Sequence, residues 1–263
     1  MRGDINFRGS DSSYLSGYFY SVLIHCIIFA MDEAQQDVPD TQIPQLDMEK
    51  RWKEAKLLKQ DLDDGKDWTQ RLHVPNEYNS WSKTFPDEDV PVKVIHRFEN
   101  MPMSAEKLIE MMSPEKMELR LKWDKTKVIE ILKKLPNKGC IGRSVIDLPF
   151  PLSNRDFVIY ISPPYETDDW SGKKAFATFL QNATHPSRPA GVDGLIRASN
   201  GGNFTITVPD DEDPENKCEM WMLTTNNYNG WVSTEFVIGR RAPKLFYPLR
   251  QSILEGYKEY FSN

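Results

Sequence analysis

Cysteine and histidine are scarce in this sequence, and their positions argue against two kinds of site. The 263 residues contain three cysteines and four histidines. Cys26, Cys140 and Cys218 are odd in number, far apart and without the Cys-x-x-Cys spacing of zinc sites. The histidines are equally scattered, so we expect no metal site, no disulfide framework and no cofactor. Reduced thiols in the cytosol are the default for such a chain.

Clusters of basic residues are missing as well. The chain has 33 basic and 39 acidic residues and a formal net charge of −6. Nucleic acids and anionic membranes are bound through clustered Lys and Arg, so neither a nucleic-acid partner nor a constitutive polybasic membrane anchor is expected. The sequence also lacks GxSxG, HExxH, GxxxxGK[ST] and GxGxxG motifs. We therefore expect no catalytic residue and no enzyme.

One long apolar stretch lies near the N-terminus, from Tyr14 to Met31. Its core is shorter than the roughly 20 residues that a transmembrane helix needs. It also lacks a small-x-small cleavage site near Ala30. Three interpretations stay open: sequence upstream of a functional start at Met31, a membrane-anchoring or interfacial segment, and a cleaved signal. We treat residues 1–46 as a leader and residues 47–263 as one domain, which is long enough for a large core.

Hydrophobic periodicity in this domain predicts a helix, three strands, two short helices, about six strands and a long final helix. The first helix spans 47–62, with Asp47 as N-cap and Gly65 beyond its end. The second short helix is expected to start at Ser113, because Ser followed by Pro114 is a helix-start pattern. The expected strands cover 68–74, 78–84, 90–99, 126–134, 140–147, 156–162, 173–181, 193–208 in two pieces, and 218–226.

Consecutive strands joined by short turns imply an antiparallel sheet. A sheet of about nine strands must curve and needs a cover on its concave face. The final helix, from about Ser233 to Tyr260, is the natural cover, and Pro243 or Pro248 should kink it. The predicted fold class is therefore α+β, with a curved antiparallel sheet covered by a long C-terminal helix.

Four segments, in order, resemble motifs of the START lipid-transfer family. LRLKWD (119–124) resembles the R-x-x-WD run that closes the family's helical insert, and PFPLSNRDFV (149–158) follows at the family's distance. GLIRAS (194–199) is similar to the GVIRA strand, and NNYNGW (226–231) to the turn before the last helix. The resemblance covers 68–260 and is nearest the phosphatidylcholine-transfer and ceramide-transfer branches. It implies a helix-grip fold with a lipid tunnel between the sheet and the final helix.

Arg120 is the strongest candidate for a ligand contact. It shares a helix face with Met117 and Leu121, so its charge could point inward. A buried cation needs an anionic partner, and a lipid phosphate could serve. The position matches the phosphate-contacting arginine of the phosphatidylcholine-transfer branch. The alternative is a solvent-facing Arg120 paired with Asp124 at i+4.

The resemblance also implies lining and gate residues. The lining residues are Arg120, Ser144, Ile146, Phe157, Ile161 and Asn203, and the gate residues are Pro149, Phe150, Pro151, Leu152, Phe246, Leu249 and Ile253. The aromatic cage for choline is mostly replaced, by Ser144 and Phe157 among others, and Ile161 replaces an arginine of the sterol branch. A phospholipid with another head group fits best, with ceramide or a sterol possible. Gate residues 149–152 could equally be a rigid structural turn, and Arg155 and Asp156 are expected to form a structural ion pair or cap.

We therefore expect a protein that binds one lipid and transfers it between membranes. It would be cytoplasmic and peripheral, with transient membrane-surface contact, although an N-terminal anchor is possible. The alternative is a lipid-sensing or scaffold module without transfer activity. Intrinsic catalysis is the other rival, because some START domains accompany thioesterase domains.

Overall fold

A computed structural model of the chain describes residues 46–124, 128–146, 153–192, 194–230 and 242–262. These residues lie in the compact unit Val38–Asn263. The apolar stretch 14–31, gate residues 149–152 and the expected helix start at Ser233 lie outside the described residues.

The elements follow the expected order. They are α2 (Met48–Asp63), β1 (Thr69–Val74), β2 (Tyr78–Thr84), β3 (Val92–Met101), α3 (Ala105–Met112), η4 (Pro114–Lys116), α4 (Met117–Trp123), β4 (Val128–Lys134), β5 (Cys140–Ile146), β6 (Arg155–Ile161), β7 (Tyr165–Trp170), β8 (Lys173–Asn182), β9 (Ile196–Arg197), β10 (Ser199–Asn200), β11 (Phe204–Pro209), β12 (Cys218–Thr224), β13 (Asn226–Asn227) and α5 (Ala242–Tyr260).

Local chemistry sets the helix ends. The Asp47 carboxylate accepts the Lys50 N–H at 2.9 Å, and Gly65 follows α2 at φ 69°, so both predicted boundaries of α2 are confirmed. Ser104 caps α3 by accepting the Lys107 N–H. Ser113 is the N-cap and Pro114 the first residue of a helical segment, as expected, but this segment is the short 3₁₀ helix η4. The Ser113 side chain makes no capping hydrogen bond there, and the α-helix α4 starts at Met117.

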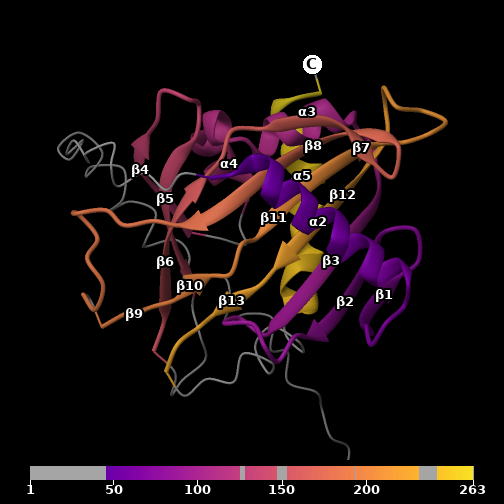
Figure 1. The fold of residues 1–263 in the computed structure, drawn as a ribbon. Helices are drawn as coiled ribbons and strands as arrows, with labels where there is room; N and C mark the ends of the chain where they lie inside the picture. Colours follow the sequence, from indigo (N-terminus) through magenta and orange to yellow (C-terminus); the bar gives the residue numbers. More distant parts are fainter. Residues whose placement is uncertain (1–45, 125–127, 147–152, 193, 231–241, 263) are drawn as a thin grey trace, which may run out of the picture. The chain divides into compact units, whose positions relative to one another are not determined.

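The main sheet has nine strands in one path, which confirms the expected number. Their order is β1-β2-β3-β12-β11-β8-β6-β5-β4, with β7 added beside β8 and the short β9 beside β6 (Figure 1). Every pairing in this sheet is antiparallel except β6 with β9, which is parallel over two residues.

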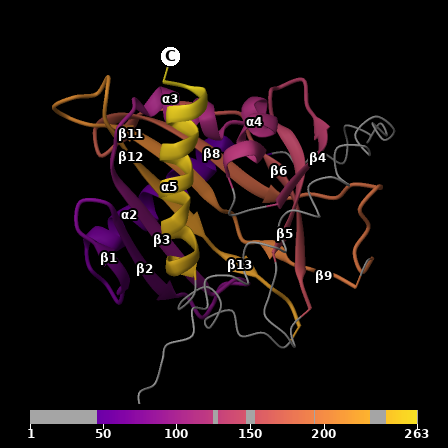
Figure 2. The same ribbon diagram turned by 180° about the vertical axis from the view of Figure 1, so that it is seen from behind.

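Helices cover both faces of the sheet. The long helix α5 crosses the face that also carries α3 and α4, and we call this the inner face (Figure 2). The helix α2 crosses the outer face (Figure 1). Successive residues of a strand point to opposite faces, so on β12 Met220 and Met222 point inward while Trp221 and Leu223 point outward to α2. Pro248 lies inside α5.

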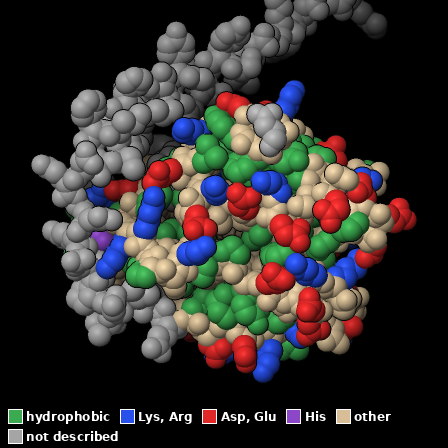
Figure 3. Space-filling view, turned by 90° about the horizontal axis from the view of Figure 1, so that it is seen from above, with side chains coloured by type: hydrophobic (Ala, Val, Ile, Leu, Met, Phe, Trp, Pro, Cys, Tyr) green, Lys and Arg blue, Asp and Glu red, His purple; other side chains and the backbone are tan. Residues whose placement is uncertain are grey.

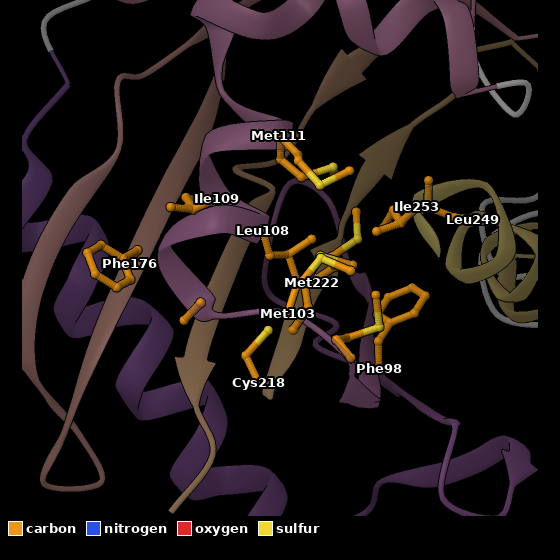
Figure 4. Packing of buried hydrophobic residues seen from close by; sticks show 14 of the residues in the cluster. Phe98, Met103, Leu108, Ile109, Met111, Phe176, Cys218, Met222, Leu249 and Ile253 are labelled. Atoms are coloured by element: carbon orange, nitrogen blue, oxygen red, sulfur yellow. The ribbon is translucent and has the colours of Figure 1, made fainter. Parts of the chain in front are cut away.

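Two apolar clusters fill the inner side. The first, which we call the helix-side cluster, joins α3, α5 and one half of the sheet (Figure 4). Leu108 and Met111 of α3 and Leu249 and Ile253 of α5 meet there above strand residues such as Phe98. The second, the lining cluster, comprises Val92, Val94, Met117, Cys140, Phe157, Ile159, Ile161, Ala198 and Tyr228. Phe246 of α5 packs against both clusters.

Candidate functional site

The short helix α4 places Arg120 on the inner side. Met117, one turn earlier, is fully buried in the lining cluster, and Trp123 is buried in the helix-side cluster. Arg120 itself is 8% exposed, so the solvent-facing alternative is wrong. Leu121, expected on the same face, is 40% exposed and points away.

Arg120 is nevertheless paired with Asp124, as that alternative had it. Its Nε donates to Asp124 Oδ2 at 2.9 Å, and both side chains are buried. No hydrogen bond links its two Nη groups to the described residues. Its positive charge reaches the lining cluster: burial raises the pKa of the Cys140 thiol to about 12, and the nearby Arg120 partly opposes that rise. Asp124 thus holds the guanidinium at Nε, and the two Nη groups have no hydrogen-bond partner among the described residues.

Four other predicted lining residues gather around the same cluster. Phe157 and Ile161 belong to it, and Ile146 packs against it. Ser144 lies opposite Phe157 in the β5–β6 register and is buried. Because β6 alternates, Phe157, Ile159 and Ile161 all point to the inner face.

Tyr228 is a member of this cluster that the sequence interpretation did not name. Its ring meets Phe157 edge-on, with centroids 5.9 Å apart. Burial raises the pKa of its hydroxyl, so the group stays neutral. The sequence signal for Tyr228 is its place in the NNYNGW segment, which resembles the turn before the last helix.

Asn203 directly precedes β11, and its backbone oxygen accepts the N–H of Leu180, which packs against the lining cluster. Its Oδ1 accepts the Thr225 N–H at 2.7 Å and its Nδ2 donates to Asn226 Oδ1 at 3.1 Å. These bonds use the side-chain amide to join the turn before β11 to the end of β12. A ligand contact at Asn203 stays a prediction.

The predicted gate residues on α5 take two different positions. Leu249 and Ile253 are 1% and 0% exposed and belong to the helix-side cluster. Phe246 is half-buried, and its ring centroid lies 4.5 Å from that of His96. Phe246 packs against both inner clusters and therefore lies where they meet.

Arg155 and Asp156 do not pair with each other, which corrects the expected ion pair. Arg155 points inward, is 1% exposed, and donates to the backbone oxygens of Tyr228 at 2.6 Å, Asn229 at 3.1 Å and Ser153. Its burial lowers the pKa of the guanidinium. Asp156 points outward to Arg143 and Arg197. Burial alone would raise the pKa of Asp156, but these two cations hold it below its ordinary value.

A groove of about 700 Å³ lies on the other side of the sheet, along α2. Its walls include Leu57, Phe85 and Phe204, and charged pairs such as Lys93 with Glu88 stand on its rim. Of the predicted lining and gate residues that the structure describes, none borders it. It is therefore distinct from the expected tunnel, which stays a prediction.

Within the described ranges, no cluster of three His, Cys, Asp or Glu side chains forms a potential metal site. No helix in that part of the chain combines the length and apolar character needed to cross a membrane.

Comparisons with known proteins agree with this architecture. The family model for the START domain matches residues 51–245. Among solved structures, human STARD10 superposes with a TM-score of 0.64 at 16% identity, covering 84% of each chain. Human StAR-related lipid transfer protein 5 gives 0.61 at 16% identity, covering 81% of this chain and 96% of that one. The lipid transfer and protein localization domain of human StarD13 gives 0.53 at 18% identity, covering 80% and 98%. A search of curated protein sequences finds no match.

Proposed function

Since the chain belongs to the START domain family, we propose that it binds a single phospholipid on the inner side of the sheet and transfers it between membranes. It acts as a non-catalytic carrier in the cytoplasm, in transient contact with membrane surfaces. The domain comprises residues 47–263, and residues 1–46 are a leader outside it.

One observation carries the choice of a phospholipid. Arg120 is buried beside an apolar lining, with its Nε fixed by Asp124 and its Nη groups without a partner among the described residues. A guanidinium held in this way presents a planar fork, and a phosphate accepts such a fork through two parallel hydrogen bonds. Asp124 thus orients Arg120 for the head group, while Phe157, Ile161 and Tyr228 contact the adjoining hydrocarbon.

The energetics of apolar burial suit a carrier. A two-chain lipid has roughly 30 methylenes, and each costs about 0.8 kcal/mol to leave in water. The lipid must therefore be enclosed by apolar residues in transit. Because a bilayer stabilises the same chains similarly, exchange between protein and membrane lies near balance.

Surface charge is consistent with brief membrane contact. On the face seen in Figure 3, acidic and basic side chains alternate among apolar ones. The net charge of −6 adds no attraction to anionic membranes. Docking would then depend on apolar contact at the site of lipid exchange.

A vesicle assay separates a carrier from a lipid sensor. Donor vesicles hold a fluorescent phospholipid with a quencher, and acceptor vesicles hold neither. A carrier that is present in much smaller amounts than the lipid moves many lipid molecules per protein molecule, whereas a sensor extracts at most one. Saturation at one lipid per protein would overturn the transfer function and leave binding intact.

Arg120→Met tests the head-group contact. Losing one partner of a buried ion pair costs roughly 3–5 kcal/mol, so phospholipid affinity should fall by about two to three orders of magnitude. Arg120→Lys should restore binding only in part, because an ammonium lacks the planar fork. A fluorescent ceramide, which has no phosphate, should lose far less affinity.

Two further variants control this experiment. Arg120→Met also removes the cation that pairs with the buried Asp124 and lowers stability, so Arg120→Met with Asp124→Leu removes both charges together. Lys122→Met removes an exposed cation of the same helix and should change nothing. Equal, small losses for phospholipid and ceramide would show that Arg120 does not contact the head group.

A further inference from the structure

A row of polar side chains crosses the inner face of the sheet between the two apolar clusters. Direct strand pairing aligns Ser80 with His96, His96 with Met222, Met222 with Thr205, and Thr205 with Thr178. The row thus runs over β2, β3, β12, β11 and β8. We call its four polar members, Ser80, His96, Thr205 and Thr178, the polar belt.

The belt lies at the boundary between the clusters. On β3, Phe98 on one side of His96 belongs to the helix-side cluster, and Val94 on the other side belongs to the lining cluster. On β8, Phe176 and Leu180 flank Thr178 in the same way. Strand alternation makes all of these side chains point inward. Phe246 spans the same boundary from α5, with its ring against His96.

The belt is buried but not fully paired. Its members are at most 7% exposed. His96 bonds the Tyr78 hydroxyl at 2.6 Å through Nδ1 and Thr224 Oγ1 at 3.2 Å through Nε2. Ser80 Oγ and Thr178 Oγ1 have no hydrogen-bond partner of standard geometry in the described part of the chain. Ser80 still interacts with the Tyr78 hydroxyl, so Thr178 Oγ1 is the belt hydroxyl that a ligand oxygen would relieve most. A buried hydroxyl without a partner is unfavourable, and an oxygen of a ligand would relieve that cost.

The belt contains no acidic side chain and no Lys or Arg, so it suits an uncharged oxygen better than a phosphate. A lipid whose head group lies beside Arg120 in the lining cluster must pass the belt if its chains extend into the helix-side cluster. The part of the ligand that meets the belt is then hydrocarbon.

We propose that the belt selects lipids that carry a hydroxyl on their hydrocarbon part, through a hydrogen bond to Thr178 Oγ1. The inference rests on the proposed lipid binding and specifies which lipid is preferred.

Competition binding tests the inference. The probes are two phospholipids that differ only in a mid-chain hydroxyl, a hydroxystearoyl form and its stearoyl counterpart, each made with choline, ethanolamine, serine and inositol head groups. Native mass spectrometry of the whole chain with equimolar pairs gives the ratio of bound lipids. One net hydrogen bond predicts a preference of roughly twofold to tenfold for the hydroxylated form.

Thr178→Val should reduce this ratio to unity while stability holds or rises, because an unpaired buried hydroxyl is removed. Thr207→Val is the matched control. It alters an inward threonine of β11 whose hydroxyl already donates to Ala105 O at 3.0 Å, so it should lower the unfolding temperature and leave the ratio unchanged.

Equal binding of the two forms by the wild type, or a preference that persists in Thr178→Val, overturns the belt inference and leaves lipid binding standing. If neither form binds with choline, ethanolamine, serine or inositol head groups, the proposed function fails, and the inference fails with it.

Discussion

The neighbours Arg155 and Asp156 illustrate how charge is arranged at the scale of single residues. They lie on opposite faces of β6, so one contacts backbone oxygens on the inner side and the other contacts two arginines on the outer side. The partners of Asp156 stand 13 and 41 residues away along the chain. Such pairing depends on strand register, and sequence neighbours alone do not reveal it.

Asp156→Asn should make the protein less stable near neutral pH. The folded state holds the pKa of Asp156 below its ordinary value, so its stabilisation is present above the unfolded-state pKa, about 3.9, and is lost as pH falls through the folded-state pKa. We expect a loss of roughly 3 kcal/mol at neutral pH. The difference from wild type should shrink below about pH 4. Urea unfolding across this pH range measures both quantities.

Asp211→Asn provides the control for this prediction. Asp211 pairs with Lys173 at 2.6 Å but its side chain is 73% exposed, and exposed pairs contribute about 0–1 kcal/mol. A pH dependence of Asp156→Asn that parallels wild type would show that the Arg143–Asp156–Arg197 contacts do not contribute to folding.

Arg120 shows what residue-level analysis could and could not predict. Met117 lies three positions earlier on the helix, and an apolar neighbour at that spacing correctly placed the guanidinium on the inner side. From the sequence, burial of Arg120 and its pairing with Asp124 are alternatives, whereas the structure has both. An i+4 pair can be buried when the whole helix turn is covered, and that covering comes from elements far away in sequence.

At the scale of elements, α4 and α5 meet through a glycine. A Cβ at Gly256 would lie 2.5 Å from Cγ of Trp123, so only glycine lets the indole approach α5 this closely. Trp123 is 3% exposed, and it belongs to the helix-side cluster with Leu249 and Ile253 of α5. The contact fixes α5 against the helix that carries Arg120.

Gly256→Ala should therefore destabilise the protein. Alanine normally favours a helix interior by up to about 1 kcal/mol over glycine. The clash with a rigid indole opposes this, and overpacking typically costs about 1–3 kcal/mol. We expect a net loss seen as a lower unfolding temperature. Gln251→Ala, on the exposed side of α5, should leave stability nearly unchanged, and a rise for Gly256→Ala would contradict the close contact.

The strand that the sequence pattern did not predict has only a weak alternation of apolar residues. The strand β7 contains Glu166, Asp168 and Asp169, and most of its residues are exposed or half-buried. It is held by pairing with β8 rather than by burying one face. The covering of the outer face by α2 was also not predicted, because an amphipathic helix does not reveal which sheet face it will bury.

At the scale of the whole molecule, the sequence predicted the number of sheet strands and the closing helix, but not the strand order. Pairing of β3 with β12 joins segments more than a hundred residues apart. Turn lengths and apolar alternation indicate which strands pair when they follow one another along the chain. They do not indicate that strands far apart in sequence, such as β3 and β12, lie side by side. The family resemblance implied the helix-grip arrangement of sheet and final helix, and the strand order comes from the structure.

Removing residues 1–30 tests the domain boundary. The described fold lies within Val38–Asn263, so a chain starting at Met31 should unfold at the same temperature and transfer lipid at the same rate. Unfolding curves and the vesicle assay on both chains measure this. A chain that folds normally but no longer exchanges lipid would assign the apolar stretch a role at the membrane, and a chain that does not fold would place it within the domain.

The apolar cluster between α2 and the outer face of the sheet matters for the stability of the protein when no lipid is bound. It packs Trp52, Trp170 and Trp221 together, and Lys59 and Arg97 lie over the Trp221 ring at 5.1 Å. A carrier spends part of each cycle empty, and a ligand adds to stability only while it is bound. The apolar lining residues Ile146, Phe157 and Ile161 pack in the lining cluster and not in the outer cluster. We therefore expect the outer cluster to contribute the same unfolding free energy with and without a bound lipid. For a protein with the proposed carrier function, the sheet would then keep its shape after delivery and receive the next lipid without refolding.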